Sequence, residues 1–152
     1  MLTLTDFQAA AERLKNVVHA VPLSTSSTFS AMSGAEVYLK YENQQKTGSF
    51  KVRGAYNKIM KRYEEGGLHA VVASSAGNHA QGVAFAASSI GVPATIVMPR
   101  SAPIAKVSAT EGFLTSTFIL PYFVLRNYPQ VWVLYSVKKI LYLLSIFLSS
   151  NV

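Results

Sequence analysis

Residues 69–110 constrain the fold most, because two short apolar runs alternate there with two helical patterns. The runs His69–Ala73 and Ala94–Met98 have the length and composition of buried strands. Helices are expected over Asn78–Ile90 and, opened by a proline, over Pro103–Thr110. The order strand, helix, strand, helix predicts right-handed βαβ units, and therefore an α/β fold with a parallel sheet.

The turn after the first apolar run is the expected ligand site. Ligands of open parallel sheets bind beyond the carboxyl ends of the strands, and residues 74–79 (SSAGNH) lie there. Asn78 and His79 open the next helix, whose free N–H groups and dipole favour a carboxylate or a phosphate. Taken alone, this stretch is equally typical of an ordinary loop with Ser and Asn caps, and of a histidine that only caps or packs.

A second motif, TGSFKVRGA at Thr47–Ala55, places Lys51 in the first turn of another helix. Thr47, Gly48 and Ser49 are typical of a helix start, and the helix is expected to run to about Tyr63. The positive end of a helix disfavours an ammonium group, which suits a lysine that has to react as a neutral amine. For this nonapeptide alone, a solvated surface lysine is the alternative.

The N-terminal third is expected to contribute one helix and one strand. Thr5 and Gln8 form a possible capping box for a helix of about three turns, with an apolar stripe behind it. Val21–Gly34 is rich in Ser, Thr and Pro and is interpreted as a loop. Glu36–Glu42 alternates apolar and polar residues, which predicts a half-buried strand.

Composition narrows the function classes. Cysteine is absent and the three histidines lack metal-ligand spacing, so no disulfide or metal site is expected. The formal charge is +7, but no basic stripe accompanies it, so nucleic acid is not an expected partner. Residues 1–5 lack the features of a signal peptide, so a cytoplasmic protein is expected.

The two motifs occur together in one known family. TGSFKVRGA followed by SSAGNHAQG, flanked by VYLKYENQQ and GVPATIVMPRSAPIAKVSATEGF, closely resembles the threonine/serine dehydratases. These belong to the tryptophan-synthase-β-like (fold type II) family of pyridoxal-phosphate enzymes. The resemblance covers about residues 5–113. Serine racemase shares the architecture, so the family is better supported than the dehydratase activity.

The resemblance implies a role for each motif. Lys51 would hold pyridoxal 5'-phosphate covalently and then remove the α-proton of the substrate. Phe50 would pack near the cofactor ring, and Asn78 would hydrogen-bond its phenolic oxygen. The substrate carboxylate would lie in a cradle formed by Ser75, Ala76, Gly77, Asn78 and His79. The implied reaction converts threonine to 2-oxobutanoate and ammonia, or serine to pyruvate and ammonia.

The resemblance stops after Phe113. Residues 1–113 are interpreted as the N-terminal part of the dehydratase domain, and residues 114–152 as a divergent hydrophobic tail without Gly, Asp or Glu. The simplest hypothesis is an out-of-frame or wrongly predicted end to a truncated gene. Its apolar run Ile140–Leu148 is short against the roughly twenty residues of a spanning helix, so membrane attachment is not expected.

This hypothesis has a chemical consequence. The family's glycine-rich phosphate loop and its Ser, Thr or Cys at the pyridine nitrogen have no counterpart in the sequence. The alternative function is therefore a catalytically inactive remnant, or a serine racemase-like member of the same fold. The family is usually homo-oligomeric, and the interface is expected to be incomplete here.

Overall fold

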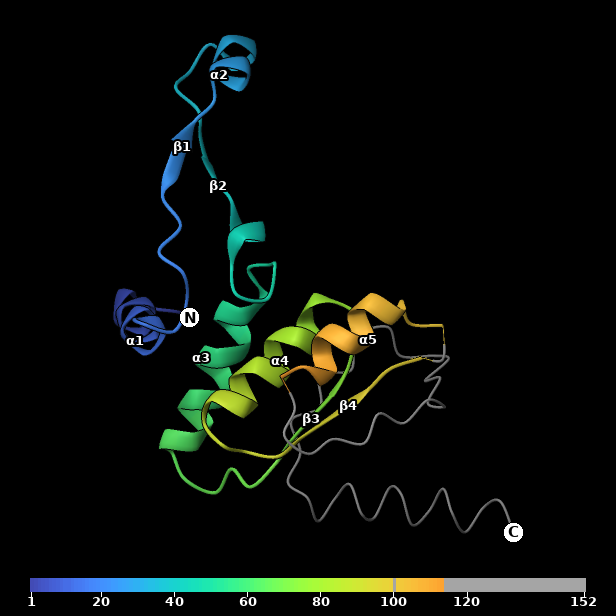
Figure 1. Cartoon of the computed structure of the whole chain (residues 1–152). Helices are drawn as coiled ribbons and strands as arrows, with labels where there is room; N and C mark the ends of the chain where they lie inside the picture. Colours follow the sequence, from blue (N-terminus) through green and yellow to red (C-terminus); the bar gives the residue numbers. More distant parts are fainter. Residues whose placement is uncertain (100, 114–152) are drawn as a thin grey trace, which may run out of the picture.

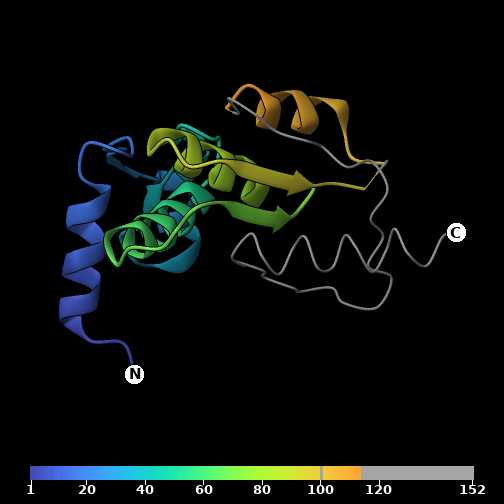
Figure 2. The ribbon, with the colours of Figure 1, turned by 90° about the horizontal axis from the view of Figure 1, so that it is seen from below.

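The computed structural model describes residues 1–99 and 101–113. Its body contains strand β3 (Val71–Ser74), helix α4 (Asn78–Ser89), strand β4 (Ala94–Val97) and helix α5 (Ile104–Glu111). β3 and β4 pair in parallel, from Val71 opposite Ala94 to Ser74 opposite Val97. Figure 2 shows the two strands side by side and pointing the same way. The predicted α/β fold with a parallel βαβ unit is confirmed.

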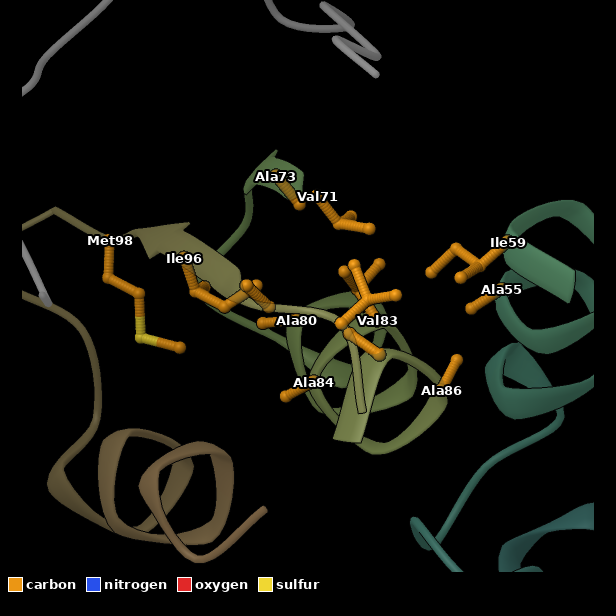
Figure 3. Close-up of a cluster of buried hydrophobic side chains, with 13 residues drawn as sticks. Ala55, Ile59, Val71, Ala73, Ala80, Val83, Ala84, Ala86, Ile96 and Met98 are labelled. Atoms are coloured by element: carbon orange, nitrogen blue, oxygen red, sulfur yellow. The ribbon is translucent and has the colours of Figure 1, made fainter. Parts of the chain in front are cut away.

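Helix α3 (Lys51–Glu64) completes the body and packs against α4. Figure 1 shows α4 between α3 and α5. Most of α4 is buried and its side chains are small, so its neighbours approach it closely on several sides. In Figure 3, Ala55 and Ile59 of α3 point toward Val83 of α4. On the other side of α4, Ile96 and Met98 extend the same core along β4.

Helix α1 (Leu4–Leu14) lies at the edge of the body farthest from α5 (Figures 1 and 2). The predicted Thr5–Gln8 capping box is wrong. Thr3 is the N-cap, its side chain accepts from the Asp6 N–H, and the Asp6 carboxylate accepts from the Thr3 N–H at 2.8 Å. A charged acceptor makes the stronger hydrogen bond and also suits the helix dipole. None of the α1 residues is buried, although Arg13 forms an ion pair with Glu64 of α3 at 2.7 Å.

Residues 23–40 form a two-stranded arm that extends away from the body (Figure 1). Strand β1 (Leu23–Thr25), helix α2 (Ser27–Ser33) and strand β2 (Tyr38–Lys40) follow in that order, and the strands pair antiparallel. The predicted loop over Val21–Gly34 is therefore wrong. Its polar residues cap a helix instead: Ser26 Oγ accepts from the Phe29 N–H, and Gly34 ends α2 with φ +70°.

The strand predicted over Glu36–Glu42 is present as the three residues of β2, followed by the 3₁₀ turn η1 (Glu42–Gln44). The expectations for residues 114–152 lie outside the described residues. Over 1–99 and 101–113, the search for a helix long and apolar enough to cross a bilayer finds none.

Candidate active site

Lys51 is the first residue of α3, two positions later than the helix start predicted from Thr47–Ser49. The reason is Gly48, which has φ +65° and donates its N–H to the Gln45 carbonyl at 2.8 Å, so the chain still turns there. Phe50 is the N-cap and contributes no capping side chain. The Lys51 Nζ lies 4.9 Å from the centre of the Phe50 ring, so the ring packs against this side chain.

The predicted ligand loop lies at the carboxyl end of β3. The Ser75 N–H donates to the Val97 carbonyl at 3.0 Å, which fixes the loop to the end of β4. Ser75 Oγ accepts from the Gly77 N–H at 3.3 Å, and α4 begins at Asn78 with no capping side chain. The first turn of α4 therefore presents uncapped N–H groups and the positive end of its dipole.

The start of α3 and the first turns of α4 meet at Gly82. A Cβ atom at this position would lie 3.1 Å from the Lys51 carbonyl oxygen and 3.3 Å from the Val52 nitrogen. Only a residue without a side chain allows the two backbones to approach this closely. His79 lies one turn before Gly82 on the same face of α4.

Lys51 and His79 are close enough to interact electrostatically. Burial lowers the pKa of the His79 imidazole below its usual value, and the positive charge of Lys51 lowers it further. The reactive amine of one motif and the helix start of the other thus share one region of the structure. This is the juxtaposition that a lysine-bound cofactor with an adjacent carboxylate cradle requires.

One member of this region, Lys106 of α5, belongs to neither sequence motif. Its Nζ donates to Asn78 Oδ1 at 2.5 Å. Its only sequence signal is a basic residue in the first turn of a helix after a proline. The contact itself depends on how α5 packs on α4, which no local pattern predicts.

Two buried hydroxyl groups flank the lysine motif. Thr47 Oγ1 and Ser49 Oγ are buried, and neither has a hydrogen-bond partner among the described residues. Leaving such a group unpaired costs about 1–3 kcal/mol. These hydroxyls are therefore groups to which a further ligand or protein atom can hydrogen-bond.

The donor set fits an anionic aldehyde cofactor. Lys51 offers an amine for a carbonyl carbon, Asn78 an amide, and the start of α4 its N–H groups. Acidic residues are absent from residues 66–110, so this part of the chain has no carboxylate to repel a bound anion. The nearest preceding acid in η1, Glu42, is paired with Arg53 at 2.8 Å.

A fold with one parallel βαβ unit, a lysine at a helix start and an uncapped anion cradle defines a class of cofactor-dependent enzyme. Residues 14–114 match the family described as pyridoxal-phosphate dependent enzyme. The chain belongs to this family, which confirms the fold type II resemblance and identifies pyridoxal phosphate as the cofactor of the family.

Three curated relatives indicate more than one reaction. L-threonine ammonia-lyase of Thermotoga maritima is 60% identical over 112 residues, which span 74% of this chain and 28% of that protein. L-threo-3-hydroxyaspartate ammonia-lyase of Pseudomonas sp. is 52% identical, spanning 71% and 34%. Serine racemase of Schizosaccharomyces pombe is 45% identical, spanning 73% and 34%. The chain thus spans about a third of the length of these relatives.

Solved structures agree with the fold. A pyridoxal 5'-phosphate-dependent aspartate racemase superposes with a TM-score of 0.72 at 38% identity, covering 79% of this chain and 38% of the other. A bacterial-type comparison comes from the T.th. threonine deaminase, which gives a TM-score of 0.70 at 36% identity, covering 83% and 39%.

Proposed function

We propose that this chain carries the cofactor lysine and the substrate-carboxylate cradle of a pyridoxal-phosphate-dependent threonine ammonia-lyase. The overall reaction removes ammonia and the elements of water from threonine and adds one water back, which gives 2-oxobutanoate. The observation that supports this proposal best is the Gly82 contact, which holds the start of α3 against α4 beside His79. The identity to the Thermotoga maritima ammonia-lyase supports threonine as the substrate.

The residues divide the work as follows. Pyridoxal phosphate, when bound, supplies the electron sink that makes the α-proton of an amino acid acidic. Lys51 Nζ holds the cofactor at its aldehyde carbon and, once free, accepts the α-proton. Asn78 donates a hydrogen bond to the phenolic oxygen, and Phe50 packs along the ring. The N–H groups of residues 75–79 bind the substrate carboxylate and keep the α-carbon near Lys51.

The experiment is turnover by the purified full chain. We expect 2-oxobutanoate to form from threonine when pyridoxal phosphate is present, and Lys51→Ala to abolish it. Lys58→Ala is the matched control, because Lys58 is an exposed lysine on the same helix. Product formation that survives Lys51→Ala contradicts the proposed role. No product from a chain that binds the cofactor favours the inactive remnant.

Racemisation is the second candidate, because a serine racemase and an aspartate racemase are among the similar proteins. Both reactions begin with removal of the α-proton, and they differ in whether a β-substituent leaves. Chiral chromatography of L-serine and L-aspartate incubations distinguishes them. The D-enantiomer without ammonia supports racemisation, and ammonia with a 2-oxo acid supports the lyase. In either case we propose a small amino acid as the substrate and a homo-oligomeric assembly.

A further inference from the structure

The contact between Lys106 and Asn78 has no role in the function proposed so far. It joins α5 to the first residue of α4, where the cofactor-facing amide lies. Lys106 is partly exposed and Asn78 is exposed, so the pair borders the open side of the site rather than the core. A hydrogen bond from an ammonium to an amide oxygen is charge-assisted and stronger than a neutral one.

The backbone of Lys106 is held firmly. The hydroxyl of Thr110, which is fully buried, donates to the Lys106 carbonyl at 2.8 Å. Just beyond α5, the Phe113 ring packs edge-on against Phe85 of α4 with ring centres 5.6 Å apart. Because these contacts fix α5 against α4, the ammonium of Lys106 stays within reach of Asn78.

The chemistry of the two groups determines the orientation of the amide. A lysine ammonium only donates, so it selects the oxygen of a carboxamide and not its NH₂ group. With Oδ1 held by Lys106, the Nδ2 donors of Asn78 point away from the ammonium. Without this contact, rotation of the amide by 180° would exchange a donor for an acceptor at the cofactor-facing position. The positive charge also polarises the amide, which makes its N–H groups better donors.

We propose that Lys106 is a positioning residue that orients the Asn78 amide so that Nδ2 donates to the phenolic oxygen of pyridoxal phosphate. This inference rests on the proposed function, because it gives Asn78 the cofactor contact described there. It assigns to α5 a part in cofactor binding that neither of the two sequence motifs contains.

The first test needs no cofactor. The side-chain amide resonances of Asn78 are assigned in a ¹H–¹⁵N spectrum by their loss in Asn78→Asp. We expect Lys106→Met, which keeps the length but loses the charge and the donors, to move these resonances, and Lys106→Arg to restore most of the shift. Lys58→Met, at an exposed lysine of α3, leaves them unchanged. Unmoved resonances in a folded Lys106→Met protein overturn the proposal.

The second test measures pyridoxal phosphate itself by absorbance titration of the full chain. We expect Lys106→Met to weaken binding about tenfold, the effect of losing one oriented hydrogen bond. The pH midpoint of the bound cofactor's spectrum should shift as well, because the phenolic oxygen loses its donor. Lys106→Arg recovers most of the affinity, and Lys58→Met binds as the unaltered chain does.

The two proposals fail differently. If the unaltered chain does not bind pyridoxal phosphate, the proposed function fails and the role of Lys106 toward the cofactor fails with it. If the unaltered chain binds, but Lys106→Met has the same affinity and the same pH midpoint, only the inference about Lys106 is overturned.

Discussion

The body and the arm of this chain are built on different principles. In the body, α4 buries seven of its residues among α3, the β3–β4 pair and α5. In the arm, β1, α2 and β2 contain no buried residue, and apolar side chains such as Phe29 and Met32 are more than half exposed. The comparison teaches that this fold is stabilised by close packing of small side chains in the body, whereas the arm relies on backbone pairing and helix caps.

The most direct way to break this comparison is to remove one large side chain from each region. Ile59 is 2% exposed in the body, and Ile59→Ala should lower the free energy of unfolding by about 3 kcal/mol, because it leaves a cavity. Phe29 is 51% exposed in the arm, and Phe29→Ala should lower it by about 0.5 kcal/mol or less. Denaturant unfolding of both variants is the measurement. Equal losses would show that the arm packs on something in solution.

A second prediction concerns the contact that creates the site. Gly82→Val should destabilise the chain by about 2 kcal/mol, because the new atoms meet the Lys51 carbonyl oxygen, a backbone atom that cannot rotate away. Gly54→Ala is the matched control in α3, where an added Cβ meets nothing within 4 Å. That change should stabilise the helix by about 0.5–1 kcal/mol. A neutral Gly82→Val would mean that α3 and α4 do not meet as described.

The junction between the arm and the body provides a third test. Glu42, just after β2, accepts two hydrogen bonds of 2.8 Å from Arg53 of α3. The hydrogen bonds and charge of Arg53 hold the pKa of Glu42 below its usual value, so its contribution is present above about pH 4.5 and is lost as the pH falls. Glu42→Gln should cost about 1 kcal/mol at pH 7 and much less at pH 3, as measured by urea unfolding. An equal cost at both values would exclude the ion pair as the cause.

The smallest effect is expected at His79. Its pKa is lowered in the folded chain, so the unfolded state takes up a proton first as the pH falls below about 6.5. Stability should therefore decrease between pH 7 and pH 5, and His79→Gln should reduce that decrease. Thermal unfolding at several pH values is the measurement, with the exposed His69→Gln as control. A decrease of the same size in both variants would mean that the pKa of the His79 imidazole is not depressed.

The sequence was sufficient for the body because each of its elements carries its own pattern. The apolar runs that became β3 and β4 lie in the body with small shifts of their ends. The arm was missed because its three-residue strands pair across a long separation, Leu23 with Lys40, and bury too little to produce a periodic pattern. Polar residues such as Ser26 were interpreted as loop formers when they serve as helix caps.

The candidate site divides in the same way. Lys51 and Asn78 could be identified because each begins a helix with a distinctive motif. Their proximity depends on Gly82, whose importance lies in what a side chain there would touch. Lys106 could not be anticipated, because its contact with Asn78 crosses from one helix to another. Local motifs thus predict the components of a site, and packing between helices decides which of them meet.

The central claim is that Lys51, among all lysines of the chain, occupies a built site for an anionic aldehyde. The most direct measurement is reduction of the pyridoxal phosphate complex with borohydride, followed by mass mapping of the labelled peptides. We predict one dominant label on Lys51, and its loss in Gly82→Val. Label distributed over exposed lysines such as Lys58 and Lys61, with none favoured, would contradict the account.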